Sequence, residues 1–285
     1  MIMKKIHFLL FMALLVLACC QSDKKGHKPT VKTQEVKDTT IVAGVYHYQF
    51  DGFELWTLQD MQRGMSMDLF PKADPAVVRK LVPTGEAESA INAFLVRRDG
   101  EYILFDTGLG LSQGGVMLDK LVMLDIKPEQ IRKVLLTHFH GDHIGGMLTD
   151  GRVTFPNAEV YFSQEEENAW KRDGRVRDML DAYNGHTHPF KAGGEVVEGV
   201  KAILAPGHTP GHTMYQIGNL LIIGDLIHAA ALQLPHPEYC PTYDYEPKLA
   251  AQTRKEVYDY IQDHKLVVAG MHLPYSGVIE DFHAE

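Results

Sequence analysis

The pattern of apolar and polar positions predicts a mixed α/β protein. Short apolar runs that favour strands alternate with longer segments in which apolar residues recur at helical spacing. The pair Asp51-Gly52, between two apolar runs, is a strong signal for a β-hairpin. In the first half we expect strands at residues 45–50, 53–58, 90–96, 102–105 and 133–136, a short helix after Asp74-Pro75, a helix at 116–124 and a helical turn from Pro128.

The second half continues the same alternation. Ser163 is a suitable N-cap for a helix, and three glutamates at residues 165–167 lie near the positively polarised start of that helix. Residues 249–264 have the periodicity of a long amphipathic helix. We expect strands at residues 159–162, 200–204, 214–217, 220–223 and 266–269, and a helix at 163–170.

The N-terminus has the pattern of a secretory signal. Lys4-Lys5 precede an apolar run at residues 6–18, which is too short to span the ~30 Å hydrocarbon core of a bilayer comfortably. The stretch Val16-Leu17-Ala18-Cys19 resembles the bacterial lipobox, whose cysteine becomes the lipidated N-terminus. We therefore expect a signal peptide at residues 1–18 and a lipoprotein anchored through Cys19 on the periplasmic face of a bacterial membrane, with ordinary cleavage and a soluble periplasmic product as the alternative.

Residues 19–42 are polar and lack periodicity, which predicts a flexible tether. The folded domain is then expected at residues 43–285, with the lipid anchor as its only contact with the membrane. The formal net charge of -9 and the lack of a lysine-arginine stripe exclude nucleic acid as a partner. Cys240 is the one cysteine of the expected domain, which excludes a disulfide framework. A homodimer stays open.

The strongest chemical signal is the stretch His138-Phe139-His140-Gly141-Asp142-His143. It follows a predicted buried strand, and Gly145-Gly146 come directly after it. The side chains of His138 and His140, two positions apart, point the same way if the backbone is extended, whereas Asp142 and His143 are adjacent and must point elsewhere. The spacing therefore predicts two neighbouring metal sites rather than one.

Other candidate ligands also follow predicted strands. His208 lies in a Gly-His-Thr-Pro-Gly-His segment, Asp225 follows Gly224, and His272 comes soon after the last strand. Loops at the ends of rigid strands could bring these side chains together. Asp106 also ends a strand, in a glycine-rich turn where a carboxylate commonly accepts hydrogen bonds from loop amides, so we expect it to support the site rather than to bind metal.

This combination resembles the metallo-β-lactamase-fold hydrolases over about residues 43–280. The resemblance implies an α/β fold, an αββα sandwich of two mixed β-sheets with external helices and a two-metal site at one edge. Imidazole and carboxylate ligands suit zinc first, with manganese, cobalt or iron as alternatives. The resemblance further implies that His138, His140 and His208 hold one ion, that Asp142, His143 and His272 hold the other, and that Asp225 bridges them.

Charge counting indicates what such a centre can do. Two divalent ions contribute +4 formally, Asp142 and Asp225 remove two charges and a bridging hydroxide removes one, which leaves +1 to bind a developing oxyanion. The bridging hydroxide would be the nucleophile, so that no serine or cysteine nucleophile is needed. Asp142 and Asp225 are the expected catalytic carboxylates, and we expect Asp225 to help a proton reach the leaving alkoxide.

Particular residues narrow the function within this resemblance. His140 favours hydrolysis, because flavodiiron oxidoreductases of this fold carry an acidic residue there. Asp225 counts against antibiotic hydrolysis, because zinc β-lactamases generally lack the bridging carboxylate. Residues 224–237 and 269–277 are similar to exported enzymes of the methyl-parathion-hydrolase-like and lactonase-like branch, although Tyr275-Ser276-Gly277 stands where Phe-Pro-Gly is usual. The implied reaction is hydrolysis of a lactone, an aryl ester or a phosphotriester, with a small molecule as substrate.

The remaining candidates surround the ligands. We expect His212 and His228 to support the site from outside, as Asp106 does. Apolar pocket walls are expected from Phe139, Trp170 and Tyr275. Substrate specificity is expected to come from residues 160–190 and 226–240.

Three other enzymatic functions stay open. They are a thioesterase of the glyoxalase II type, an iron-dependent persulfide dioxygenase and a metallo-β-lactamase. Metal analysis, oxygen consumption and a substrate panel would separate them. A non-catalytic binding lipoprotein is less consistent with the sequence, because a degenerate relative would have lost a ligand and all seven ligand positions are filled.

Overall fold

The computed structural model describes residues 32–33, 44–191 and 193–283, all within the compact unit Val31–Glu285. The expected signal peptide at 1–18 and the lipidation site Cys19 lie outside these residues, as does most of the expected tether at 19–42. Within that tether, Lys32–Thr33 forms a short strand, β1, where no secondary structure was expected. None of the helices that the structure describes has both the length and the apolar composition needed to cross a bilayer.

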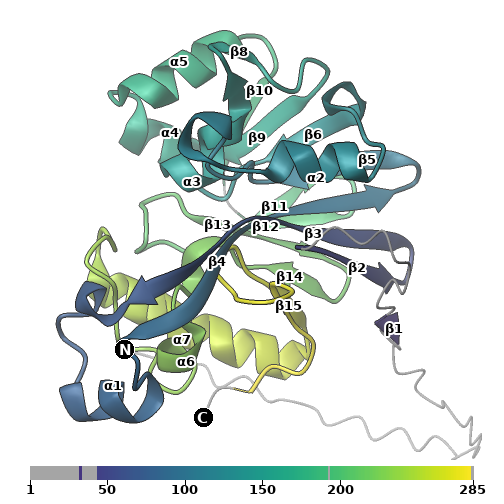
Figure 1. Ribbon diagram of the computed structural model, residues 1–285. Coiled ribbons are helices and arrows are strands. Elements are labelled where there is room, and N and C mark those ends of the chain that lie inside the picture. The colour runs from purple at the N-terminus through teal and green to yellow at the C-terminus, as the bar shows by residue number, and fades with distance from the viewer. Residues whose placement is uncertain (1–31, 34–43, 192, 284–285) are drawn as a thin grey trace, which may run out of the picture. The chain divides into compact units, whose positions relative to one another are not determined.

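The first sheet changes from antiparallel to parallel pairing across its width (Figure 1). Neighbouring strands are antiparallel from β1 to β5, and parallel from β5 through β6 and β9 to β10. The hairpin predicted at Asp51-Gly52 is confirmed. In order across the sheet, the strands are β1 (Lys32–Thr33), β2 (Val45–Phe50), β3 (Phe53–Ser66), β4 (Glu86–Arg98), β5 (Glu101–Phe105), β6 (Ile131–Leu135), β9 (Glu159–Ser163) and β10 (Thr187–Phe190).

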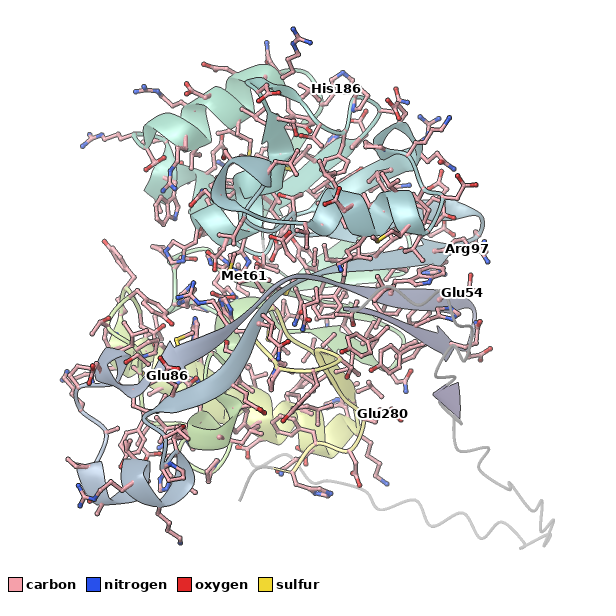
Figure 2. All side chains as sticks on the ribbon, viewed as in Figure 1. Glu54, Met61, Glu86, Arg97, His186 and Glu280 are labelled. Carbon is pink, nitrogen blue, oxygen red and sulfur yellow. The ribbon has the colours of Figure 1, made fainter. Side chains whose placement is uncertain are left out.

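The paired strands β3 and β4 are longer than the sequence predicts. The register joins Glu54 to Arg97 at one end, where their side chains form an ion pair, and Ser66 to Glu86 at the other. Figure 2 shows Glu54 and Arg97 together at one side of the molecule and Glu86 at the opposite side. The extension beyond residue 58 was not predicted because the segment after it is largely polar. This extension brings the end of β3 to the metal centre described below.

The second sheet is mostly antiparallel, with one parallel pair, β14 and β15. Parallel strands place their carboxyl ends at the same edge of a sheet, so the segments that follow β14 and β15 lie close together. A separate two-stranded ribbon contains β7 (Leu148–Thr149) and β8 (Arg152–Val153). In order, the second sheet contains β11 (Gly194–Val197), β12 (Val200–Leu204), β13 (Thr213–Ile217), β14 (Leu220–Ile222), β15 (Val267–Ala269) and β16 (Val278–Ile279).

Helices cover the outer faces of the two sheets, as the αββα expectation requires. In Figure 1, α2, α4 and α5 lie over the first sheet and α7 lies over the second. The helices α3, α5 and α6 were not predicted. The helices are α1 (Pro75–Leu81), α2 (Met117–Met123), α3 (Gly141–Ile144), α4 (Gln164–Trp170), α5 (Gly174–Ala182), α6 (Ala230–Gln233) and α7 (Pro247–His264). The 3₁₀ turns are Met67–Leu69, Leu111–Gln113, Pro128–Gln130, Gly145–Met147 and Gly224–Leu226.

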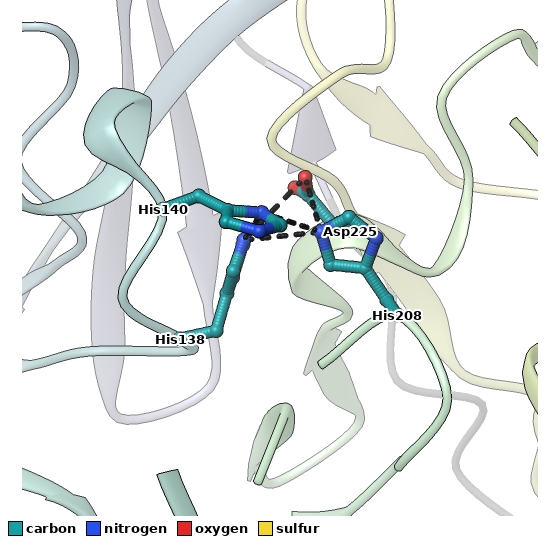
Figure 3. Close-up of side chains that lie close together, drawn as sticks. All are labelled: His138, His140, His208 and Asp225. Carbon is teal, nitrogen blue, oxygen red and sulfur yellow. Dashed lines mark hydrogen bonds and ion pairs between the residues drawn. The ribbon is translucent and has the colours of Figure 1, made fainter. Parts of the chain in front are cut away.

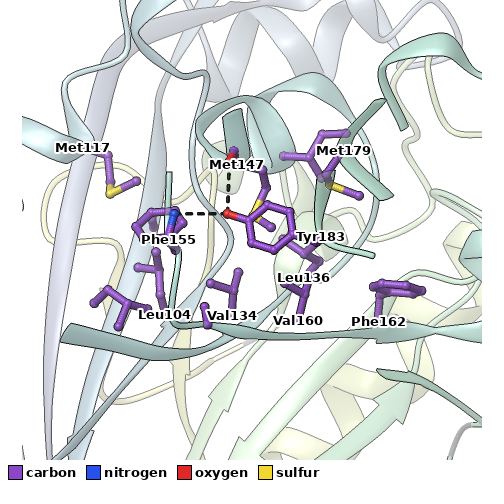
Figure 4. Packing of buried hydrophobic residues seen from close by; sticks show 14 of the residues in the cluster. Leu104, Met117, Val134, Leu136, Met147, Phe155, Val160, Phe162, Met179 and Tyr183 are labelled. Atoms are coloured by element: carbon purple, nitrogen blue, oxygen red, sulfur yellow. Dashed lines mark hydrogen bonds between the residues drawn. The ribbon is translucent and has the colours of Figure 1, made fainter. Parts of the chain in front are cut away.

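Three clusters of buried apolar side chains fill the three interfaces between these layers. Side chains of α2 and α5 pack on the outer face of the first sheet (Figure 4). A second cluster lies between the two sheets, and a third lies between the second sheet and α7. The neighbours Leu104 and Phe105 of β5 belong to the outer and the central cluster respectively. Because successive side chains of a strand face opposite ways, this strand is apolar on both faces, which explains its continuous apolar run.

Candidate metal centre

The predicted ligands lie in loops that leave the two sheets at one edge. The stretch from His138 to His143 follows β6 of the first sheet, and His208 lies between β12 and β13 of the second. Asp225 follows β14, and His272 follows β15, the parallel neighbour of β14. The site is therefore assembled from both sheets, at the strand ends where the sequence placed it.

The local backbone of the histidine loop agrees with its spacing. His140 is extended and forms the N-cap of α3, so Asp142 and His143 already lie in a helical turn. The glycines that follow permit a close approach to the neighbouring loop. A Cβ atom on Gly145 would lie 2.1 Å from the carbonyl oxygen of Leu109. Only glycine fits at that position without moving the backbone of either loop.

The first ligand group consists of three ring nitrogens that converge (Figure 3). His138 Nε2 lies 3.0 Å from His140 Nδ1 and 3.2 Å from His208 Nε2, and the last two nitrogens are 2.9 Å apart. Nitrogens bound tetrahedrally at about 2.0–2.1 Å from zinc would be roughly 3.3 Å apart. The three rings therefore have a separation close to that required by one shared ion.

The second ligand group consists of Asp142, His143 and His272, whose ligand atoms all lie within 4.8 Å of one another. Asp142 Oδ1 is 3.7 Å from His143 Nε2, and Asp142 Oδ2 is 3.5 Å from His272 Nε2. Asp142 and His143 follow the first group in the sequence but turn away from it in space. The prediction of two neighbouring groups from the loop spacing agrees with this geometry.

Asp225 lies between the two groups. Its Oδ2 is 3.3 Å from His208 Nε2 in the first group and 3.1 Å from His272 Nε2 in the second. Its Oδ1 is 3.2 Å from His143 Nε2. A carboxylate in this position can bind one ion with each oxygen or share an oxygen between them, which is the bridging arrangement implied by the family resemblance.

The buried atoms of the centre support the binding of cations. His143 Nε2 and Asp225 Oδ1 are buried, and neither has a hydrogen-bond partner among the described residues. Buried polar atoms are almost always paired, because leaving them unpaired costs free energy. Both atoms are acceptors when His143 carries its proton on Nδ1 and Asp225 is ionised. Divalent metal ions therefore fit this set of donors.

Asp106 fixes the tautomers of two ligands, as the sequence predicts for a supporting group. Its Oδ2 accepts a hydrogen bond from His143 Nδ1 at 2.7 Å, which leaves His143 Nε2 free to face the centre. The same oxygen accepts from Thr137 Oγ1 at 2.7 Å, and Thr137 Oγ1 accepts from His138 Nδ1 at 3.0 Å. Asp106 Oδ1 accepts from the Thr137 backbone N–H at 2.7 Å. One buried carboxylate thus orients a ligand from each group.

A second carboxylate that the sequence did not suggest orients His208. Asp244 Oδ1 accepts a hydrogen bond from His208 Nδ1 at 2.9 Å. Arg254, buried in α7, lies with its Nη2 3.5 Å from Asp244 Oδ2 and donates to the carbonyl oxygens of Leu226 and Pro237 at 2.7 and 2.6 Å. Arg254 therefore links the orientation of His208 to the segment that follows Asp225.

Glu166 is another supporting residue that the sequence did not reveal. Its Oε1 accepts a hydrogen bond from the Phe139 backbone N–H at 3.0 Å, and its Oε2 accepts from Thr209 Oγ1 and the Gly211 N–H at 2.8 and 2.9 Å. The histidine loop and the turn that carries His208 are thereby joined. From the sequence, the three adjacent glutamates are only acidic residues near the start of a helix. Nothing in that run distinguishes Glu166 from its two neighbours.

Burial and neighbouring charges shift the pKa values of the ligands in different directions. Burial, followed by the charge of His208, lowers the pKa of His140 to about 3, so this ring is neutral. Burial would raise the pKa of Asp225, but the charges of His143 and His272 outweigh it and hold this pKa well below its usual value. Burial opposes a charge on His208, yet hydrogen bonds to Asp225 and Asp244 raise its pKa to about 9. The ionised carboxylates thus attract positive charge to the centre.

His212 and His228 surround Asp225, in the supporting positions that the sequence predicts. His212 Nε2 accepts a hydrogen bond from the Asp225 backbone N–H at 2.9 Å, while its Nδ1 donates to the Ala205 carbonyl oxygen at 3.0 Å. His228 Nε2 lies 3.2 Å from Asp225 Oδ2, and its ring stacks on that of His272 with centroids 5.1 Å apart. These contacts hold both the backbone and the carboxylate of Asp225.

A cavity of about 290 Å³ opens onto the two ligand groups. Its lining contains no residue of the segments 160–190 and 226–240, so the expectation that these segments determine specificity is wrong for this cavity. The walls come instead from the end of β3, the turn after it and the segment before α7. The described lining residues are Arg63, Met65, Leu69, His140, Gly141, Asp142, His208, Asp225, Tyr243 and His272.

The three aromatic residues expected in the pocket walls lie outside this cavity lining. Phe139 is fully buried in the outer core, where its ring packs edge-on against Phe162 with centroids 5.1 Å apart. It alternates with the two ligand histidines and so faces the opposite way. Tyr275 is 60% exposed and donates a hydrogen bond to Glu88. The Trp170 ring lies edge-on to that of His140, with centroids 5.2 Å apart, but Trp170 is not among the lining residues. The expectation of these pocket walls is wrong.

The comparisons with known proteins agree with this fold. A family model described as the Metallo-beta-lactamase superfamily matches residues 87–272. The crystal structure of AbOPH, a hydrolase in the beta lactamase superfamily, superposes with a TM-score of 0.77 at 31% identity and covers 84% of this chain and 93% of that chain. AidC, a dizinc quorum-quenching lactonase, superposes with a TM-score of 0.75 at 26% identity, over 83% of this chain and 92% of that chain.

A hydroxyacylglutathione hydrolase from Aeromonas salmonicida is 31% identical over 134 residues, which are 47% of this chain and 45% of that protein. The chain spans about half the length of the first curated relatives that it matches.

Proposed function

Because the chain belongs to the metallo-beta-lactamase superfamily, we propose that it is a metal-dependent hydrolase that cleaves lactones or related esters, phosphotriesters among them, at a two-metal centre. The observation that carries this proposal is the position of Asp225, whose oxygens lie within 3.3 Å of ligand nitrogens from both groups. The likeness to the lactonase AidC at 26% identity supports the choice of ester bonds.

The metal ions are expected to be zinc, because histidine and carboxylate ligands in low coordination numbers suit it best. When bound, two divalent ions would polarise a carbonyl or phosphoryl oxygen and lower the pKa of water toward neutrality. Manganese, cobalt and iron remain compatible with the same donors. The first ion would be held by His138, His140 and His208, the second by Asp142, His143 and His272, and Asp225 would be shared.

The two catalytic carboxylates differ in their access to solvent. The Asp142 side chain is 26% exposed and lines the cavity, so it can exchange protons with solvent. The Asp225 side chain is 3% exposed and is held by His212 and His228. In this proposal the ionised Asp225 would accept the proton that the attacking water loses and give it to the leaving alkoxide, while Asp142 would exchange protons with solvent.

The cavity suits a small substrate with an apolar part. Besides the metal ligands, Arg63 and Gly141, the described walls consist of Met65, Leu69 and Tyr243. A volume of about 290 Å³ is at the lower end of typical ligand sites. A lactone ring or a short acyl or aryl group fits such a space, and a large polymer would have to enter with one end only.

A thioesterase of the glyoxalase II type is the second candidate. This candidate is supported by the 31% identity with a hydroxyacylglutathione hydrolase over 134 residues, which overlap the part of the chain that belongs to the superfamily. The same centre could polarise a thioester carbonyl as well as an ester carbonyl. Only the relative rates on the two bond types separate these candidates.

A substrate panel on the purified, zinc-loaded protein tests the proposal. The panel contains a lactone, an aryl ester, a phosphotriester, a thioester and a cephalosporin at equal concentrations. We expect the highest kcat/KM on the lactone or the aryl ester. Asp142→Asn should lower that value by about 100-fold or more, because even outer partners of metal ligands cost 10–100-fold.

The control for this panel is Asp263→Asn, which changes an exposed aspartate of α7 and should leave all rates within about twofold. A clear preference for the thioester would contradict the lactonase assignment and support the thioesterase assignment. If no panel member is hydrolysed while the iron-loaded protein consumes oxygen, the hydrolase proposal is wrong and a dioxygenase takes its place.

We also propose that the protein is exported and meets its substrate outside the cytoplasm. The basic start, the apolar residues 6–18 and Cys19 support a lipoprotein on the periplasmic face of a bacterial membrane. Mass spectrometry of the mature N-terminus would identify a lipidated Cys19. Cys19→Ser should move the protein from the membrane fraction to a soluble fraction, and an unmodified N-terminus in the membrane fraction would contradict lipidation.

A further inference from the structure

Among the described residues that line the cavity above the ligand groups, Arg63 is the only lysine or arginine. It lies near the end of β3, in the extension that the sequence did not predict. An exposed arginine is ordinarily a solvated surface residue, so its position near the site needs independent support. That support comes from its strand register, its lack of an acidic partner and the walls beside it.

The strand register directs Arg63 toward the metal centre. Arg63 pairs with Ser89 of β4 in an antiparallel register, and opposite residues of such a pair point to the same face. Ser89 Oγ donates to the carbonyl oxygens of His228 and His272 at 3.2 and 3.1 Å. The face that carries Arg63 is therefore the face against which the second ligand group packs.

Arg63 forms no ion pair with a described residue, although the chain contains 37 acidic and 28 basic residues. Glu86, at the start of the neighbouring strand β4, lies on the opposite face of the sheet. Gly64 faces the opposite side of the sheet from Arg63. A Cβ atom on Gly64 would lie 2.8 Å from Glu86 Oε2, so the Glu86 carboxylate lies on the side of Gly64. The guanidinium is thus available to a ligand.

Met65 and Tyr243 line the same cavity as Arg63 and the metal ligands. Met65, two residues after Arg63 on the same strand face, accepts a hydrogen bond from Tyr243 through its sulfur at 3.3 Å. The Tyr243 ring lies edge-on to His208 with centroids 6.1 Å apart. Burial raises the pKa of Tyr243, and the charge of Arg63 acts against this rise, which agrees with their proximity.

We propose that Arg63 binds an anionic group of the substrate, so that the site prefers esters or lactones that carry a carboxylate a short apolar segment away from the scissile bond. Guanidinium and carboxylate groups match in shape and charge, and the pairing is stronger when the surroundings are apolar. Hydrolysis adds one water across the ester bond to give an acid and an alcohol, and the remote carboxylate is unchanged. This inference rests on the proposed function for the bond that is cleaved.

The kinetic test compares two 4-nitrophenyl esters of adipic acid on the zinc-loaded protein, one with a free distal carboxylate and one with that carboxylate methylated. We expect the free acid to be preferred by about 10-fold in kcat/KM, through KM. Arg63→Met should remove this selectivity, Arg63→Lys should retain part of it, and Arg172→Gln, at an exposed site on the segment between α4 and α5, should retain all of it. A ratio that is the same in wild type and Arg63→Met overturns the inference and leaves the hydrolase proposal intact.

A binding measurement keeps the inference testable without turnover. Adipate and hexanoate differ by one terminal carboxylate, and calorimetry on the zinc-loaded protein gives their dissociation constants. We expect wild type to bind adipate about 10-fold more tightly than hexanoate, and Arg63→Met to bind the two alike. Equal affinities in wild type would overturn the inference. If neither ester is hydrolysed but the binding preference holds, the proposed function fails and Arg63 remains an anion site.

Discussion

Two side chains, Asp106 and Thr137, decide which ring nitrogens of His138 and His143 face the metal centre. The hydrogen bonds run from His138 through Thr137 to Asp106, and from His143 directly to Asp106. Each ring is thereby held in the Nδ1–H tautomer, with the lone pair of Nε2 pointing inward. Ligand identity alone would not ensure that geometry, because a histidine ring can flip and change tautomer.

We predict that Asp106→Asn weakens zinc binding by about 10–100-fold. Asparagine has one acceptor oxygen, so if this oxygen keeps the bond from the Thr137 N–H, its NH₂ group faces the donor Nδ1–H of His143. Zinc affinity measured by competition with a chromophoric chelator would show the loss.

The matched control for that variant is Asp150→Asn. Asp150 shares the left-handed backbone of Asp106, with φ of 51° against 56°, but is exposed. It should bind zinc as wild type does. If Asp106→Asn also keeps the wild-type zinc affinity, Asp106 does not orient the ligands, and its hydrogen bonds serve only the fold.

At the residue scale, the sequence predicts the ligands but not all their partners. The His138–His143 stretch concentrates metal-binding side chains in a way that a core or surface loop would not. Asp244 and Glu166 reach His208 and the histidine loop only through the fold. Asp244 has no metal-binding pattern around it, and Glu166 lies in a run of three glutamates typical of a solvated helix start, so their roles could not be predicted.

At the scale of elements, strands that are buried on both faces are the most predictable. The neighbours Leu104 and Phe105 enter different cores, so their strand is apolar throughout and easily recognised. The end of β3 and the helix α5 escape detection because they are largely polar. Their positions depend on β4 and on the outer core rather than on their own composition.

A buried tyrosine ties the end of α5 to the segments on either side of the β7–β8 ribbon. Tyr183, which follows α5, accepts a hydrogen bond from the Phe155 N–H and donates one to the Met147 carbonyl oxygen, both at 3.1 Å (Figure 4). Its ring is 2% exposed. We predict that Tyr183→Phe lowers the free energy of unfolding at pH 8 by about 1–3 kcal/mol, because the Phe155 N–H loses its partner and the Met147 carbonyl oxygen keeps only the bond from the Thr154 N–H.

The pH dependence of the same variant gives a second measurement. Burial raises the pKa of Tyr183 to about 12, from 10.0, so between these values the folded protein keeps a proton that the unfolded chain releases. Its contribution to stability is therefore complete below pH 10 and falls by up to roughly 2–3 kcal/mol as the pH rises to about 12.

Urea unfolding across this range should show a smaller alkaline loss in Tyr183→Phe than in wild type. Tyr245→Phe, at a side chain that is 70% exposed, should match wild type throughout. Parallel alkaline losses in wild type and Tyr183→Phe would show that the Tyr183 hydroxyl stays accessible to water in the folded protein.

At the scale of the whole molecule, the metal centre joins the two sheets. The histidine loop follows a strand of the first sheet, while His208, Asp225 and His272 follow strands of the second. The central core between the sheets must form before the two sets of ligands meet. Metal binding and folding are therefore coupled, and zinc should raise the thermal stability of the protein.

The same architecture explains why the ligands could be predicted from sequence while the cavity walls could not. The ligand loops follow strand ends, which the apolar runs reveal, and the family resemblance adds their order. Arg63, Met65 and Tyr243 come from two segments far apart in the chain, and only the length of β3 brings them together. Substrate recognition thus depends on features with no local pattern.

The most direct test of the two-metal account is a zinc titration of activity. The protein is stripped with a chelator, its metal content is checked, and hydrolysis of the best panel substrate is followed as zinc is added. The account predicts negligible activity in the stripped protein and a maximum at about two zinc ions per chain. Hydrolysis that persists in the fully stripped protein, or an activity that is complete at one ion, would contradict it.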